Sequence, residues 1–175
     1  TTILGSAKLS GKTKNGLAIG ILESITADEK AVIDNSGERR KESVEPFTSY
    51  FAGRLKQDFN KGETTLGGMF TAVNRDINNP ALSYLPTGAY TAGIDFQHYW
   101  KERIWYVAGN AEFSNIKGKE DALINLQRSS ARYYQRPDAE HLSVDSSLTS
   151  LSGYGGTIKV GRTSQKKLQF ETSLT

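Results

Sequence analysis

The chain of 175 residues contains no cysteine, which excludes disulfide bonds and thiolate metal sites within it. It also lacks an apolar run of the roughly 18 residues that a membrane-spanning helix needs. Only two histidines are present, His98 and His141, and a single histidine without neighbouring ligands does not make a metal site. The net charge is +3 and the basic residues are scattered, so the sequence does not indicate a nucleic-acid-binding surface.

One short motif resembles a phosphate-binding loop, but the residues around it do not match such a loop. The stretch GSAKLSGKT ends in Gly-Lys-Thr at Thr13, yet Ser6 stands where that loop requires its first glycine. Residues 14–16 are Lys-Asn-Gly, a turn signal, and a strand-like segment follows instead of a helix. We therefore expect a tight turn between two strands here and no nucleotide site.

Alternation with a period of two dominates the rest of the chain. In residues 47–59, one set of alternate positions is apolar or small, and the other set carries the charges. Such alternation is typical of strands with one apolar face. The pattern predicts eight strands, near 3–11, 16–27, 46–59, 64–75, 87–100, 104–116, 151–162 and 166–174.

The connections between these strands alternate in length. Short turns are expected at 12–15, 60–63, 101–103 and 163–165, and long polar loops at 28–45, 76–86 and 117–150. This order is typical of outer-membrane barrels, with short periplasmic turns and long extracellular loops. We therefore predict an all-β, antiparallel, up-and-down transmembrane β-barrel, with residues 1–175 forming one segment of a larger barrel. A complete eight-stranded barrel is the second choice, and a soluble β-sandwich or barrel is the alternative.

The positions of the aromatic residues also favour a membrane. Phe47 and Phe59 lie on one face, and their separation corresponds to roughly 30 Å along the axis of a tilted barrel. Trp100 and Trp105 flank a short turn, where an aromatic girdle is expected. We predict that His98, beside Trp100 on the apolar face, is an interfacial residue.

Two features fit this scheme less well. Glu23 falls among the apolar positions of its strand, so either it lies at the membrane interface or the assumed alternation is out of phase there. The sequence LGGMF at 66–70 is rich in glycine, which predicts a bend or bulge in the fourth strand.

The charged face is the first candidate functional surface. Its residues tune solute selectivity if the barrel is open, and they pair with one another or with a plug if it is narrow; the sequence leaves both readings open. The predicted lumen-lining residues are Lys8, Arg54, Lys56, Asp58, Arg75, Asp95, Glu112, Lys159 and Glu171.

The loop at 117–150 is the second candidate. Ala122, Leu123 and Leu126 have helical spacing, which predicts a short helix. Aromatic and arginine side chains suit a glycan or peptide contact, although we favour packing of this segment into the barrel mouth. His141 with the nearby acids could bind a cation or act as an acid–base set, but a solvated loop is the preferred interpretation. The outer-loop candidates are Arg132, Tyr133, Tyr134, Arg136, Asp138, Glu140 and His141.

Three segments resemble a known family: residues 117–150, residues 67–76 (GGMFTAVNRD) and residues 86–105 (PTGAYTAGIDFQHYWKERIW). The most specific is SSARYYQRPDA at 129–139. The chain resembles the middle of the C-terminal outer-membrane barrel of a Bacteroidota family of unknown function. Its members typically carry an N-terminal β-domain like carbohydrate-binding family 9.

The departures from this family concern extent. No signal peptide or preceding β-domain is present, and Thr175 is not the terminal aromatic of many such barrels. We therefore expect the chain to be a portion of a longer protein.

The expected function follows from the barrel. We predict a channel, solute-uptake or platform component of the bacterial outer membrane that performs no covalent chemistry and is not an enzyme. The resemblance supplies no catalytic residues, and we expect no cofactor or metal. The expected partners are the lipid bilayer and lipopolysaccharide, with other envelope proteins and glycans as further candidates, and no nucleic acid. The alternatives are a glycan-binding or hydrolytic surface protein acting through 117–150, and a soluble β-scaffold.

Overall fold

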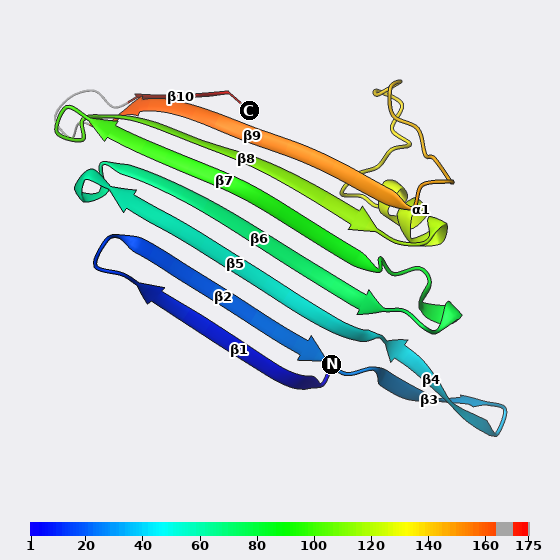
Figure 1. The fold of residues 1–175 in the computed structure, drawn as a ribbon. Coiled ribbons are helices and arrows are strands. Elements are labelled where there is room, and N and C mark those ends of the chain that lie inside the picture. The colour runs from blue at the N-terminus through cyan, green and yellow to red at the C-terminus, as the bar shows by residue number, and fades with distance from the viewer. Residues whose placement is uncertain (164–169, 175) are drawn as a thin grey trace.

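The computed structural model describes residues 1–163 and 170–174. One antiparallel, eight-stranded sheet in the order β1-β2-β5-β6-β7-β8-β9-β10 makes up most of it (Figure 1). The strands are β1 (Ile3–Lys12), β2 (Leu17–Thr26), β5 (Phe47–Phe59), β6 (Thr64–Asp76), β7 (Gly88–Trp100), β8 (Trp105–Lys117), β9 (Ser150–Arg162) and β10 (Phe170–Leu174). The predicted all-β antiparallel fold is confirmed. The sheet is open, because β1 and β10 each have only one neighbour among the described strands.

Seven of the eight predicted strands have boundaries within one residue of those observed. The strong alternation accounts for this agreement, because each strand has one predominantly apolar face. The eighth was predicted at 166–174, and β10 occupies its last five residues. Residues 166–169 lie outside the described part of the chain, as do two residues of the turn predicted at 163–165.

The segment 28–45 is not the irregular loop that we predicted. It forms a two-stranded hairpin of β3 (Glu29–Asn35) and β4 (Glu38–Glu45), separate from the main sheet. Ser36 and Gly37 link the strands with φ angles of 55° and 93°. Positive φ at both central residues matches the right-handed twist of a hairpin.

An ion-paired carboxylate supports this turn. The backbone N–H of Gly37 donates to Asp34 at 2.9 Å, and the Arg39 guanidinium donates to the same carboxylate at 3.0 Å. Both bonds favour the ionised form, so they lower the pKa of Asp34 below its usual value. In the sequence, the Ser36-Gly37 dipeptide was the feature that could have predicted this hairpin.

The glycine-rich strand β6 has no bulge, contrary to our prediction. Its pairing with β5 runs without interruption from Phe47 opposite Asp76 to Phe59 opposite Thr64. Its register with β7 is equally regular. Among the described residues of the main sheet, a register shift is found only at the start of β1, between Ile3 and Gly5.

Helix α1 (Glu120–Arg128) confirms the helix predicted in the long loop. Ala122 and Leu123 are fully buried, and Leu82 of the neighbouring loop is also buried. A Cβ atom at Gly118 would lie 3.0 Å from Leu123 and 3.2 Å from Pro86, so the two loops are closely packed. Within the described residues, no helix has the length and apolar character to cross a membrane.

The side chain of Gln127 joins α1 to the second half of its loop. Gln127 is fully buried, and its amide exchanges two hydrogen bonds of 2.8 Å with the backbone of Asp145. A further bond of 3.2 Å reaches the carbonyl oxygen of Leu123. Both the nitrogen and the oxygen of this buried amide therefore have hydrogen-bond partners.

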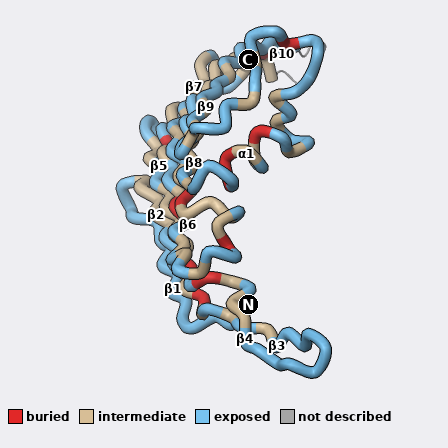
Figure 2. The backbone as a smooth tube through the Cα atoms, turned by 90° about the vertical axis from the view of Figure 1, so that its right-hand side faces the viewer, coloured by how far each residue is buried: buried red, intermediate tan, exposed pale blue. Residues whose placement is uncertain are grey.

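The long loops lie over one side of a curved sheet. Figure 2 shows the sheet bent into an arc, with α1 and the loops on its concave side. Arg75 of β6 donates to the carbonyl oxygen of Pro86 at 3.1 Å, which ties one of these loops to that side. The face that carries Arg75 is therefore the concave one.

Replacing Gln127 tests whether this amide organises the loop. We expect Gln127→Ala to leave the Asp145 backbone groups unpaired, with a local cost of about 1–3 kcal/mol. Hydrogen exchange of the amides in 120–149 should accelerate, while exchange in β7 and β8 should not change. Gln135→Ala is the matched control, because Gln135 is exposed in the same loop. Equal exchange in both variants would contradict the assigned role.

Candidate functional site

The register separates the side chains of the sheet into two chemically different faces. Residues paired directly across neighbouring strands point to the same side. Arg54 pairs with Met69, Met69 with Gly93, and Gly93 with Glu112, so these four residues share one side of the sheet. The side containing them is called the ionic face below. All nine predicted lumen-lining residues belong to it: Lys8, Arg54, Lys56, Asp58, Arg75, Asp95, Glu112, Lys159 and Glu171.

The opposite side is called the apolar face. Its aliphatic and aromatic side chains are accessible in this structure, as Ile94 (63%) and Leu55 (53%) illustrate. Glu23 pairs with Phe51 and therefore lies on this face, so the assumed alternation was in phase. Besides Glu23 and Gln57, the large residues of this face include Leu9, Leu17, Ile19, Ile21, Phe51, Leu55, Leu66, Phe70, Ile94, Phe96, Val107, Phe113, Tyr154, Ile158 and Val160.

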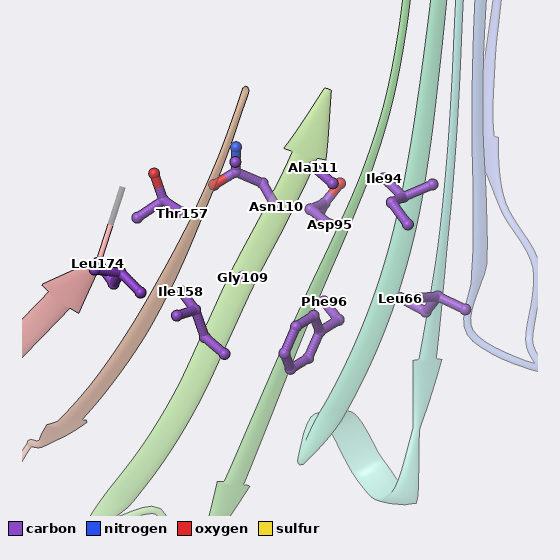
Figure 3. Close-up of a pocket in the computed structure, with 11 residues that line it drawn as sticks. Leu66, Ile94, Asp95, Phe96, Gly109, Asn110, Ala111, Thr157, Ile158 and Leu174 are labelled. Atoms are coloured by element: carbon purple, nitrogen blue, oxygen red, sulfur yellow. The ribbon is translucent and has the colours of Figure 1, made fainter. Parts of the chain in front are cut away.

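A shallow hollow of about 530 Å³ lies on the apolar face between β6 and β10 (Figure 3). Its floor is formed by small residues such as Gly109 and Ala111, and Phe96, Ile94 and Ile158 surround them. The Phe96 ring lies over Gly109, where a Cβ atom would come within 2.6 Å of it. Asp95, Asn110 and Thr157 also border the hollow, but the register assigns their side chains to the ionic face, so the apolar face contributes hydrocarbon contacts here.

The ionic face contains a salt bridge that spans three strands. Arg54 on β5 makes two contacts with Asp95 on β7, of 2.6 and 2.9 Å. Gly67 on β6 lies beneath the pair, and a Cβ atom there would lie 2.6 Å from the carboxylate and 2.7 Å from the guanidinium. The glycine therefore provides the space that this bidentate pair occupies.

Two further carboxylates of this face are also paired. Lys12 contacts Asp58 at 2.5 Å, and Lys159 contacts Glu171 at 3.2 Å. Tyr106 also donates to Glu171, and the Tyr106 ring covers Gly161 of the next strand. Lys12 was not among the predicted lumen residues, because the expected strand ended one residue earlier. Within residues 1–163 and 170–174, no ion pair involves Lys8, Lys56 or Glu112.

The outer-loop candidates do not converge on one site. Arg136 and Asp138 form an exposed ion pair of 3.6 Å, and Tyr133 is about half exposed (49%). Arg132 and Tyr134 are partly buried, and Glu140 and His141 are exposed. Across the described residues, no three His, Asp or Glu side chains are arranged to hold a metal ion.

The local contacts of this loop support packing more than catalysis. The Ser147 hydroxyl and backbone N–H donate to Asp145, which lowers the pKa of that carboxyl. Asp145 is therefore engaged with Ser147 and not with His141. Ala139, within the segment of the candidates, is buried, a packing role that its sequence context did not reveal.

Aromatic residues cluster on the apolar face beside the short turns. Trp100 lies between Trp105 and His98, at centroid distances of 6.4 and 6.0 Å. Phe170 meets Trp105 edge-on at 5.5 Å. The Thr64 hydroxyl lies 2.8 Å from His98 Nδ1. The structure thus brings together the residues that we expected at an aromatic girdle, with His98 among them.

Adjacent glycines on opposite faces provide a matched test of the Arg54–Asp95 pair. We expect Gly67→Ala to destabilise the fold by about 1–3 kcal/mol, because the methyl group displaces the ion pair. Gly68→Ala, whose Cβ would meet nothing closer than 3.8 Å, should be neutral or stabilising by up to about 1 kcal/mol. Urea unfolding of both variants measures the difference. The same effect in both would show that Gly67 has no such spacing role.

Comparison with known proteins gives a family match over most of the chain. The family described as Domain of unknown function (DUF5916) matches residues 1–151. No curated protein and no solved structure matches the chain.

Proposed function

The chain belongs to the DUF5916 family, and we propose that it forms part of the wall of a bacterial outer-membrane β-barrel. The observation that carries this proposal is the separation of the two faces across all eight strands. In a barrel wall, the apolar face contacts lipid and the ionic face lines an enclosed, aqueous interior. The concave position of the ionic face supports this assignment, because the inner surface of a barrel wall is concave.

Strand length supports a membrane as the environment. Strands β5 to β9 of the main sheet each have 13 residues. At about 3.3 Å per residue and a tilt near 40°, such a strand spans roughly 30 Å, the thickness of the hydrocarbon core. Strands of soluble proteins usually have about five or six residues.

The uncovered apolar face disfavours a soluble scaffold. A soluble sandwich would place a second layer on this face, yet α1 and the long loops lie on the other side (Figure 2). None of the described elements covers residues such as Ile94 and Leu55. Lipid and lipopolysaccharide would cover them in the proposed barrel.

The open edges of the sheet favour a larger barrel. In hydrocarbon, unpaired backbone groups at a strand edge are costly, so membrane sheets close completely. The outer edge of β1 and that of β10 lack partners among the described strands. We propose that further strands pair at both edges.

The more specific assignments rest on the resemblance of residues 129–139. We propose a Bacteroidota outer-membrane protein whose role is solute passage or solute binding without covalent chemistry. A platform role in an envelope complex is the second candidate. Glycan binding or hydrolysis through 117–150 has less support, because the candidate residues of that loop are dispersed.

Neighbouring positions on β7 test which face meets lipid. Thr91 lies on the ionic face and Ala92 on the apolar face, and the chain has no cysteine. In the full-length protein in membranes, we expect Thr91→Cys to react with a water-soluble maleimide and Ala92→Cys to react at least tenfold more slowly. A fluorophore at Ala92→Cys should be quenched by brominated lipid. The reverse pattern would contradict the assignment of the two faces, and loss of the bromolipid quenching or release of the protein into detergent-free buffer would favour the soluble scaffold.

Charge reversal tests the channel role separately. If the interior is open, Arg54→Glu should lower the ratio of anion to cation permeability in planar bilayers, because it replaces a cation of the ionic face. Lys61→Glu makes the same charge change in the exposed turn at 60–62 and should have little effect. A protein that inserts but conducts no current would favour the platform role.

A further inference from the structure

The ionic face has a polar hollow of about 280 Å³ in the half nearer the short turns. Lys56 of β5 and Thr65 of β6 border one end, and Thr157 and Lys159 of β9 border the other. Between these ends lie two adjacent rows of the sheet. One row runs from Lys56 through Gly67, Asp95 and Asn110 to Thr157, and the other from Asp58 through Thr65, Gln97 and Ala108 to Lys159.

Small residues form the floor of this hollow. Ala108 and Gly109 border the hollow, whereas Gly67 lies beneath the Arg54–Asp95 pair, which covers that part of the row. Phe96 also borders the hollow, but its side chain belongs to the apolar face. The hollow therefore offers polar and charged contacts, without an aromatic surface on which a sugar ring could stack.

The carboxylates around the hollow are already neutralised. Asp95 is held by both terminal nitrogens of Arg54, and Asp58 is paired with Lys12. Glu171 is paired with Lys159 and also accepts from Tyr106. A cation entering the hollow would have to compete with these partners.

The ammonium group of Lys56 makes no ion pair in the part of the chain that the structure describes. Glu112 is the remaining carboxylate of this face, and it lies one row further away, beside Gly93 and Gly155. Asn110 adds a side-chain amide donor on the same face, and the Gln97 amide nitrogen, which already donates to the Tyr99 hydroxyl at 2.8 Å, has a second N–H. A lysine ammonium group and amide N–H donors around a small polar hollow can bind an oxyanion by charge-assisted hydrogen bonds.

We propose that this hollow binds the carboxylate or phosphate group of a small anionic solute. The inference rests on the proposed function, since it identifies the class of solute that the barrel interior takes up. Lys56 supplies the charge, and Gln97 and Asn110 orient the oxyanion. Lys159 remains paired with Glu171 and borders the far end of the hollow.

Titration calorimetry of the full-length protein in detergent micelles tests this site without requiring conduction. Inorganic phosphate and succinate are the two probes, which distinguish a phosphate from a carboxylate preference. We expect saturable binding of at least one probe, weakened at least tenfold by Lys56→Gln and largely kept by Lys56→Arg. Asn110→Leu should also weaken binding, and circular dichroism verifies that each variant keeps its strand content.

Lys8→Gln is the matched control, because it removes the same charge from the same face but outside the hollow. Equal weakening by Lys8→Gln and Lys56→Gln would overturn the proposal, since it would indicate only the general field of the face. Absence of saturable binding by either probe would also overturn it. Either result leaves the maleimide reactivity at Thr91→Cys and Ala92→Cys unaffected, so failure of the site and failure of the barrel can be distinguished.

Discussion

The unbroken register of the main sheet is the constraint on which the other features depend. Backbone hydrogen bonds fix each strand against its neighbour, so every side chain is committed to one face. A slip of one residue between β6 and β7 would exchange the faces of the two parts of the sheet, placing Asp95 in the row of Leu55 and Ile94 in the row of Arg54. The cost of burying or isolating such charges explains why the alternation stays in phase from β1 to β10, and why even Glu23 is carried onto the apolar face.

Glycines within the strands have specific spatial roles in this register. Gly67 makes room for the Arg54–Asp95 pair, which would otherwise be displaced by a methyl group. Gly109 and Gly161 are each covered by an aromatic ring from the next strand, Phe96 and Tyr106 respectively. Such rings compensate for the packing that a glycine loses in a strand. The glycines that suggested a bend or bulge in the fourth strand are therefore among those that let bulky side chains fit across the sheet.

The sequence predicted what depends on local periodicity and missed what depends on contacts between distant segments. The main strands and α1 follow from alternation or helical spacing that persists over several residues. The hairpin of β3 and β4 has charges on both of its faces, so it lacks an apolar period, and only Ser36-Gly37 marked it. The pairing of Gln127 with Asp145 and the space that Gly67 provides join residues far apart in the chain. The outer-loop candidates were selected by residue type alone, and residue type does not determine whether side chains converge.

The apolar face would be stabilised by lipid, whereas the unpaired backbone groups at the open edges of the sheet need water or further strands. Water can satisfy the unpaired backbone groups at the outer edges of β1 and β10, but it leaves a broad hydrocarbon surface exposed. Lipid covers that surface, but it cannot pair with the edges. Both demands are met when further strands extend the sheet at each side and lipid covers the apolar face. The same arrangement would enclose the ionic face in water, where Lys56 and the paired carboxylates remain solvated.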